Sequence, residues 1–120
     1  MHPNTANARM QIYKVFRQAE WAQMQQDGRT RGAPVDLADG YIHFSTADQL
    51  AVTLSRHFGG EDGLILLACD ADRLAPALRW EPSRGGALFP HLYRALTLDD
   101  IAWSRPLPLT ETGHDLGVLE

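Results

Sequence analysis

The segment from Asp39 to Gln49 limits the fold more than any other part of the chain, because it holds a turn, a short strand and the start of a helix. It begins with an Asp-Gly turn signal, and Tyr41 to Phe44 form a β-branched and aromatic run typical of a strand. Thr46 and Gln49 have the spacing of a capping box, which predicts that a helix begins there. His43 is therefore expected at a rigid edge, beside helix N–H groups that can receive an anion. A ligand contact and a structural histidine bonded to backbone both fit this position.

The composition indicates one small domain. The 120 residues are 44% hydrophobic, which is enough apolar material for one core but not comfortably for two. The formal net charge of -4 and the pI near 5.7 argue against a protein that holds nucleic acid by a basic surface. A small local basic site remains compatible with this charge.

The single cysteine and the lengths of the apolar runs bear on the compartment. Cys69 ends the apolar run that starts at Leu64, so we interpret it as a small buried hydrophobe rather than half of a disulfide or part of a metal cluster. No apolar run approaches the length of a membrane span, and the polar segment Met1 to Arg9 has no hydrophobic region behind it. The sequence therefore predicts a cytoplasmic protein that is neither secreted nor anchored.

The first third of the chain predicts an arm, a strand and a helix. Residues 1–10 are polar and rich in asparagine, so we expect a flexible N-terminal arm. Ile12 to Phe16 has strand composition, and a short helical pattern that includes Trp21 ends near Gly28. Arg29 to Pro34 contains glycine, proline and two arginines, so we expect a loop there.

A helix and a buried strand should follow the central segment. Apolar residues recur at helical spacing from Leu50 to Phe58, and paired glycines then end the helix. His57 lies in the last turn, where an imidazolium favours the negative end of the helix dipole, so we prefer a structural role for it. The unbroken apolar run from Leu64 to Cys69 predicts a central strand covered on both faces.

The last third of the chain contains a second candidate ligand segment. We expect a turn or short helix and then an edge-like strand over Leu74 to Trp80, and a final strand over Ile101 to Leu107. Between them, the proline and paired glycines of Glu81 to Gly86 predict a loop whose backbone can approach a ligand closely, and which presents Glu81, Ser83 and Arg84. Arg84 is suited to clamp a phosphate or a carboxylate through two hydrogen bonds.

Strands that alternate with short helices early and crowd together late predict an α+β fold. We expect a single domain over residues 11–107 and a peripheral tail over residues 108–120. The lack of a glycine-rich nucleotide loop disfavours a doubly wound parallel sheet. The residues predicted to form the core are Ile12, Trp21, Ile42, Leu50, Leu54, Phe58, Leu64, Leu66, Leu92 and Trp103.

A long, ordered set of motifs supports a resemblance to a known bacterial family. The motifs are Ile12-Tyr13-Lys14, Trp21, Asp39-Gly40-Tyr41-Ile42-His43-Phe44-Ser45-Thr46, Arg56-His57-Phe58, Trp80-Glu81, Ser83-Arg84-Gly85-Gly86 and Phe89-Pro90-His91-Leu92-Tyr93. On these residues the chain resembles the domain-of-unknown-function 952 family. The resemblance implies a fold similar to the ADP-ribosyltransferase superfamily, a split pair of small antiparallel sheets with a nicotinamide dinucleotide cleft between them.

The resemblance also implies roles for residues on three strands. Lys14 takes the place where transferases of the superfamily usually have a histidine or arginine that holds the ribose. His43 and Ser45 lie on the second strand, facing the cleft or its rim. His91 lies on the third, near the place of the glutamate that steadies an oxocarbenium-like ribose in many members. A histidine lacks that fixed negative charge, so ordinary protein ADP-ribosylation is disfavoured, while members that act on nucleotides or RNA phosphate remain compatible. Glu81 can replace the glutamate only if its loop folds across the cleft.

Three classes of function remain, and the first is a transferase-type enzyme. It would act on NAD or a related phosphate-bearing nucleotide, with NAD as a substrate and with no metal ion. His43 and Ser45 would orient ribose or phosphate, Arg84 would neutralise phosphate, and Glu81 or His91 would act at the reacting carbon. The ligand-binding residues expected in this cleft are Lys14, Ser45, Thr46, Ser83, Arg84 and Tyr93.

The other two classes lack this chemistry. The second is a non-catalytic nucleotide-binding domain that keeps the cleft. The third is a metal site of His43, His57 and His91, although these lack the paired spacing or cysteine partners of a recognisable site. We expect a small-molecule nucleotide as the ligand, no nucleic-acid or membrane partner, and an oligomeric state that the sequence leaves open. The residues expected to converge on one cleft are His43, Ser45, Glu81, Ser83, Arg84, His91 and Tyr93.

Overall fold

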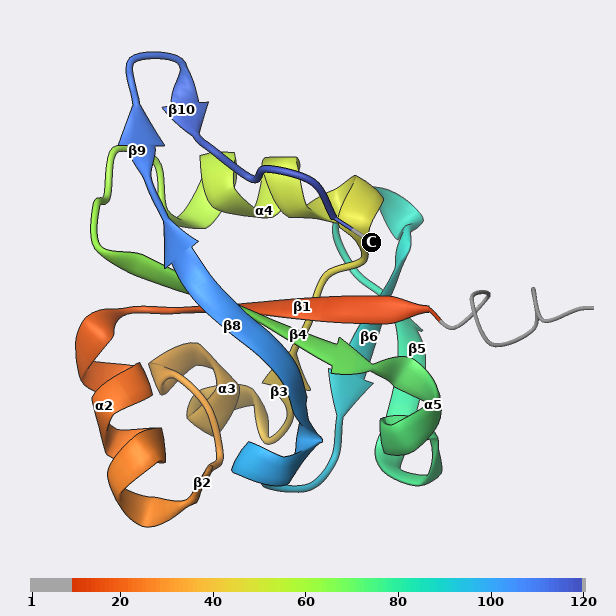
Figure 1. Cartoon of the computed structure of the whole chain (residues 1–120). Helices are drawn as coiled ribbons and strands as arrows, with labels where there is room; N and C mark the ends of the chain where they lie inside the picture. The colour runs from red at the N-terminus through yellow and green to blue at the C-terminus, as the bar shows by residue number, and fades with distance from the viewer. Residues whose placement is uncertain (1–9, 120) are drawn as a thin grey trace, which may run out of the picture.

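A three-stranded antiparallel sheet lies at the centre of the computed structural model, which describes residues 10–119 except for the side chain of Arg84. Its strands are β1 (Gln11–Phe16), β4 (Leu64–Asp70) and β8 (Ile101–Leu107), with β4 in the middle. Leu64 to Cys69 are all buried, which confirms the prediction of a central strand covered on both faces. Figure 1 shows this sheet crossing the middle of the molecule.

A second antiparallel sheet lies beside the first and contains the segment with His43. It consists of β3 (Ile42–His43), β6 (Leu88–Leu92) and β5 (Leu78–Pro82), in that order. The two sheets meet where Ser45 follows β3, because Ser45 and Tyr13 of β1 exchange two backbone hydrogen bonds of 2.8 and 2.9 Å. The mixture of several antiparallel sheets and short helices confirms the α+β class.

Helices cover both sides of the central sheet (Figure 1). On one side α4 (Ala47–His57) buries Leu50 and Leu54, and it begins after Thr46 as predicted, with the Thr46 N–H donating to Oε1 of Gln49 at 3.0 Å. On the other side lies α2 (Gln18–Asp27), which ends at Gly28 in the left-handed region, with φ of 78°. Both helices agree with the expected spacing.

The segment expected to be a loop contains regular structure instead. Arg29–Thr30 form β2, which pairs with β7 (Leu96–Thr97), and Pro34–Asp39 form a helix, α3. Proline at the first turn of a helix gives up no intrahelical hydrogen bond, and Gly40 ends α3 with φ of 87°. The loop prediction treated Pro34 as a chain breaker, whereas here it starts a helix.

The buried apolar residues form two clusters rather than the single core expected. The central sheet separates them, because successive side chains of a strand point to opposite faces. Of the predicted core, Ile12, Ile42 and Leu92 lie in one cluster with Trp21 packed against it. Leu50, Leu54, Leu64 and Leu66 lie in the other, with Phe58 and Trp103 packed against it. Cys69 is fully buried as expected, and burial raises the pKa of its thiol to about 12.

Short elements complete the fold, and two of them differ from the sequence prediction. After β4 come α5 (Ala71–Leu74) and η1 (Ala75–Ala77), and later η2 (Arg84–Gly86) and η3 (Leu98–Asp100). Glu81 lies on the edge strand β5 and not in the following loop. The segment expected to be a peripheral tail forms a hairpin of β9 (Leu109–Thr110) and β10 (Gly113–His114), and Leu116 and Leu119 then pack against a core cluster.

The structure bears only partly on the expected N-terminal arm and on the expected lack of a membrane span. Residues 1–9 of the expected arm lie outside the described residues, and the Met10 carbonyl accepts a hydrogen bond from the Ala71 N–H at 3.0 Å. Within residues 10–119, no helix has the length and apolar character needed to cross a membrane.

Replacing Leu66 tests the packing of the central strand. Leu66→Ala removes a fully buried side chain from the middle of the sheet, so we expect the free energy of unfolding to fall by about 2–5 kcal/mol. Val52→Ala, on the solvent side of α4 with 53% of the residue exposed, is the control and should change it by less than about 0.5 kcal/mol. Urea unfolding measures both values. A loss below about 1 kcal/mol for Leu66→Ala would contradict the packing described here.

Candidate active site

Two histidines stand side by side on the polar face of the second sheet. His43 of β3 pairs directly with His91 of β6, and their ring centroids are 5.3 Å apart. Their neighbours Ile42 and Leu92 point to the opposite face and belong to a core cluster, as strand alternation requires. Tyr41 stacks on the His91 ring with a centroid distance of 4.2 Å. Strand pairing therefore fixes the positions of both imidazoles.

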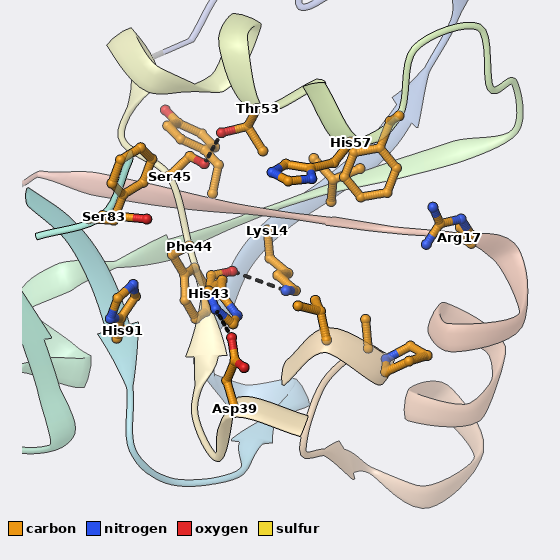
Figure 2. A pocket seen from close by; sticks show the side chains of 17 residues that line it. Lys14, Arg17, Asp39, His43, Phe44, Ser45, Thr53, His57, Ser83 and His91 are labelled. Atoms are coloured by element: carbon orange, nitrogen blue, oxygen red, sulfur yellow. Dashed lines mark hydrogen bonds and ion pairs between the residues drawn. The ribbon is translucent and has the colours of Figure 1, made fainter. Parts of the chain in front are cut away.

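A cavity of about 520 Å³ lies against these histidines, between the second sheet, β1, α3 and α4. In Figure 2 the labelled lining side chains extend from Ser83 and His91 on one side to Arg17 on the other. Its lining side chains come from segments far apart in the sequence: Tyr13, Lys14, Val15, Arg17, Ala33, Pro34, Val35, Asp39, His43, Phe44, Ser45, Thr53, His57, Phe58, Ser83, Phe89 and His91. The elements thus meet at one cleft.

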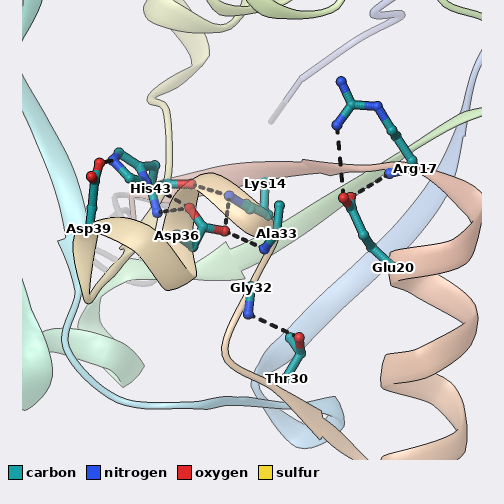
Figure 3. A network of polar contacts seen from close by, with 9 residues as sticks. All are labelled: Lys14, Arg17, Glu20, Thr30, Gly32, Ala33, Asp36, Asp39 and His43. Atoms are coloured by element: carbon teal, nitrogen blue, oxygen red, sulfur yellow. Dashed lines mark hydrogen bonds and ion pairs between the residues drawn. The ribbon is translucent and has the colours of Figure 1, made fainter.

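A buried ion pair supports the floor of this cleft (Figure 3). Lys14 Nζ lies 2.7 Å from Oδ2 of Asp36, and both side chains are buried. Lys14 Nζ also donates to the backbone carbonyl of His43 at 3.0 Å. Oδ2 of Asp36 accepts from the Ala33 N–H at 2.7 Å, and Oδ1 accepts from the His43 N–H at 3.1 Å. Asp36 therefore ties β1, α3 and β3 together.

The pKa values of this ion pair reflect a balance of burial and attraction. Burial raises the pKa of Asp36, but the hydrogen bond from His43 and the Lys14 ammonium more than offset it and hold the pKa below its usual value. Burial lowers the pKa of Lys14, and the neighbouring Asp36 carboxylate opposes this only in part. These shifts favour the ionised form of Asp36 and disfavour the ionised form of Lys14.

His43 lies between two carboxylates. Its Nδ1 is 2.6 Å from Oδ1 of Asp36, and its Nε2 is 2.9 Å from Oδ2 of Asp39. The contact with Asp36 is a hydrogen bond, whereas the contact with Asp39 is an ion-pair distance when the ring is protonated. Ionised carboxylates only accept hydrogen bonds, so a protonated His43 ring would have an acidic partner at each of its two nitrogens.

His91 has a different environment, with a carboxylate on one side only. Its Nδ1 is 2.8 Å from Oε1 of Glu81, which also accepts a hydrogen bond from the Tyr93 hydroxyl at 2.6 Å. The hydrogen bonds from Tyr93 and then His91 lower the pKa of Glu81, so Glu81 is an acceptor and the proton of His91 lies on Nδ1. His91 Nε2 is buried and has no hydrogen-bond partner among the described residues. In the neutral ring this nitrogen carries an unused lone pair.

Only part of the predicted site lines the cleft directly. Lys14, His43, Ser45, Ser83 and His91 do so. The Ser45 hydroxyl is 2.8 Å from that of Thr53 on α4, which fixes its position. The other predicted residues are not part of the lining. Glu81 contacts His91, Tyr93 donates a hydrogen bond to Glu81, and Thr46 caps α4. The side chain of Arg84 lies outside the described structure.

Sequence reasoning missed Asp36 and Asp39, although a signal for α3 was present. Pro34 and Gly40 bracket the helix at the positions that each residue favours, and Asp36 then falls at the third helical position, where acidic side chains are common. The contact with Lys14 joins residues far apart in the chain, so spacing alone gave no sign of it. Arg17, Thr53, Phe58 and Phe89 also line the cleft without having been predicted.

The cleft lining has more basic than acidic side chains, whereas the whole chain has a net negative charge. Lys14, Arg17 and three histidines contribute nitrogen donors or acceptors, whereas Asp39 is the acidic member of the described lining. Arg17 is also bound to Glu61, through Nε at 2.8 Å and Nη2 at 3.0 Å. No group of three or more histidine, cysteine or acidic side chains among the described residues could hold a metal ion, so the geometry gives no support to the third hypothesis.

The fold and the cleft define a small α+β protein with a two-histidine site. Its residues 15–104 match the model of a family described as "Protein of unknown function (DUF952)", and the chain belongs to this family. The X-ray structure of CC0527 from Caulobacter crescentus is similar, with 44% sequence identity and a TM-score of 0.84 over 88% of this chain and 94% of that one. The solution NMR structure of CC0527 gives 44% identity and a TM-score of 0.78 over 87% and 90%. No curated protein matches the chain.

Neutralising Asp36 tests the ion pair beneath the cleft. Asp36→Asn keeps the shape of the side chain but leaves the Lys14 ammonium without its buried carboxylate, so we expect the free energy of unfolding at pH 7 to fall by about 3–5 kcal/mol. Asp39→Asn, at a half-exposed side chain, is the matched control and should change it by less than about 1 kcal/mol. Chemical denaturation of the three proteins gives the comparison, and equal effects of the two substitutions would contradict the assignment.

The stability contribution of Asp36 should depend on pH. The pKa of Asp36 is lower in the folded protein than in the unfolded chain, so its contribution is present above the unfolded value of about 3.9 and is lost as the pH falls through the folded value. The difference in unfolding free energy between the parent and Asp36→Asn should therefore be largest near neutral pH and shrink below about pH 4. Urea unfolding from pH 7 to pH 2.5 measures it. A difference that stays constant over this range would show that the charge of Asp36 is not responsible.

Proposed function

We propose that the cleft binds a phosphate-bearing nucleotide, NAD or a relative of it, and that the protein is an enzyme of the ADP-ribosyltransferase-like type. One observation carries the proposal. The three strands that the resemblance assigns to the motif of that superfamily bring Lys14, His43 and His91 to a single cavity. These three residues are far apart in the sequence, and a shared ligand site requires that they converge in space.

The size and walls of the cavity suit a nucleotide. A volume of about 520 Å³ falls in the range of ligand pockets, about 300–1,000 Å³. Phe44, Phe58 and Phe89 supply apolar and aromatic wall for a base or a nicotinamide ring. Hydrogen-bond donors at the floor and at the end near Arg17 suit phosphate oxygens.

His91 would supply the proton chemistry. Glu81 holds the proton of His91 on Nδ1, which leaves Nε2 as the nitrogen that would accept the proton of a hydroxyl or of water. Because Nε2 is buried in the ligand-free protein, the proposal requires that ligand binding expose it. In the proposed reaction the oxygen of that nucleophile bonds to the ribose carbon, the bond from this carbon to nicotinamide breaks, and nicotinamide leaves with the bonding electrons. Glu81 acts through His91 as a positioning residue, rather than at the reacting carbon as its place in a loop had suggested.

A non-catalytic nucleotide-binding domain is the second candidate, and a specific observation favours it. The acidic side chain of the described lining, Asp39, is bound to His43 and so is not available as the fixed charge that steadies an oxocarbenium-like ribose. The two candidates predict the same ligand and differ only in turnover.

Nucleotide titration followed by a turnover assay tests the proposal. Isothermal titration with NAD and with ADP-ribose should show saturable binding, and nicotinamide should appear when the protein is incubated with NAD. Binding without nicotinamide release across a panel of hydroxyl acceptors would favour the non-catalytic domain. If neither nucleotide binds, the proposed function is wrong in both forms.

Substitution of His91 separates catalysis from binding. His91→Phe keeps an aromatic ring in the stack with Tyr41 but removes Nε2, so we expect the rate of nicotinamide release to fall by roughly 10²–10⁴-fold with little change in affinity. Glu81→Gln should lower the rate less, because the amide can still accept from Nδ1. Trp80→Phe lies on the opposite face of β5 and is the control. Melting temperatures confirm that all three variants fold, and a parent-like rate for His91→Phe would exclude His91 as the base.

A further inference from the structure

Asp39 lies on the same helix as Asp36 and also contacts His43, but its surroundings differ. It is the last residue of α3, and 44% of its side chain is exposed. Its Oδ2 lies 2.9 Å from the His43 Nε2, and it lines the cavity (Figures 2 and 3). A carboxylate of the chain itself therefore lies within ion-pair distance of His43 Nε2 at the cleft.

The charges around His43 balance in two layers. In the lower layer the Lys14 ammonium faces the Asp36 carboxylate in a buried pair, and Asp36 does not line the cavity. In the upper layer the His43 ring faces Asp39, which does line it. A ligand that approaches His43 Nε2 therefore meets a nitrogen whose partner is already an anion.

We infer that the Nε2–H of His43 is an anion subsite, that Asp39 fills it in the ligand-free protein, and that a phosphate group of the ligand replaces Asp39 there. This inference rests on the proposed function, since it assigns one phosphate of the nucleotide to a particular atom. It makes Asp39 a competitor of the ligand and a determinant of its affinity.

The surroundings of the two aspartates explain why Asp39 can leave and Asp36 cannot. Asp36 is fully buried and accepts from the N–H groups of Ala33 and His43, from the imidazole and from Lys14. Asp39 is held by an exposed contact of the kind that contributes little net stability in water. Its carboxylate also lies at the C-terminal end of a helix, where the partial charge of the backbone is negative. Moving Asp39 toward solvent therefore loses little.

The diphosphate group of NAD or ADP-ribose, with two negative charges, is better suited than a carboxylate to this subsite. It offers more acceptor oxygens and more charge to the imidazolium than Asp39 does, so it can compete with a carboxylate that is tethered beside it. The alternative is that Asp39 stays in place and binds a ligand hydroxyl directly. The two arrangements predict opposite effects of removing the charge of Asp39.

The test is the affinity of Asp39→Asn for two probes, ADP-ribose and inorganic phosphate. If Asp39 competes with phosphate, Asp39→Asn should bind ADP-ribose roughly fivefold more tightly than the parent, and inorganic phosphate more tightly as well. Asp99→Asn removes one negative charge from an exposed residue outside the described lining and should stay within about twofold of the parent. Isothermal titration at constant ionic strength measures each dissociation constant.

A second substitution shows whether the gain passes through His43. In a His43→Gln background neither Asp39 nor phosphate has an imidazolium partner, so most of the gain from Asp39→Asn should disappear. Circular dichroism of the His43→Gln protein verifies its fold. If that variant does not fold, the comparison of Asp39→Asn with Asp99→Asn still decides the question.

Each outcome separates this inference from the proposed function. If ADP-ribose binds the parent and Asp39→Asn equally, or binds Asp39→Asn more weakly, the subsite assignment is wrong while the nucleotide proposal stands. If inorganic phosphate binds more tightly to Asp39→Asn but no nucleotide binds to either protein, the subsite is supported and the nucleotide proposal is wrong. No binding of any probe to either protein overturns both.

Discussion

A lysine and an aspartate paired out of reach of solvent determine how the cleft is built. Lys14 belongs to the central sheet, Asp36 to α3, and the lysine also donates to the backbone of His43 in the second sheet. Separating such a pair leaves an uncompensated buried charge, so each of these three elements is fixed relative to the others. A hydrophobic pair of similar volume would fill the same space, but it would not orient an imidazole. The ion pair therefore matters for the position of His43 as well as for the stability of the fold.

The apolar and turn signals of the sequence were enough to predict most of the elements. The run ending at Cys69 was long and apolar throughout, and it is the central strand; the helix after Thr46 and the final strand also lie where expected. The failures have two causes. Pro34 both breaks and starts helices, so α3 was missed, and Asp36 with it. The division of the core into two clusters depends on which helices cover which face of the sheet, and this is decided by long-range packing.

In the candidate site too, local sequence patterns identified some residues, whereas contacts between distant segments could not be predicted. His43, Ser45 and His91 were identified because strand positions beside turns carried polar side chains, and the structure brings them to one cavity. Glu81 was assigned to a loop, yet it lies on β5 and reaches His91 across the sheet. The partner of each imidazole comes from a different element, and no local spacing reports it. The sequence indicated the histidines and Glu81, but neither the aspartates beside His43 nor the pairing of Glu81 with His91.

Those carboxylates give two neighbouring histidines unlike properties. His43 has an aspartate at each nitrogen and so presents donors when protonated, whereas a single glutamate at Nδ1 of His91 leaves Nε2 of the neutral ring as an acceptor. A donor on His43 beside an acceptor on His91 would favour different ligand groups. An anion, which only accepts hydrogen bonds, suits His43, and a hydroxyl, which can donate one, suits His91. A phosphorylated ribose carries both kinds of group close together. If the proposed function holds, the placement of three acidic side chains, more than the two imidazoles themselves, would determine which ligands the cleft accepts.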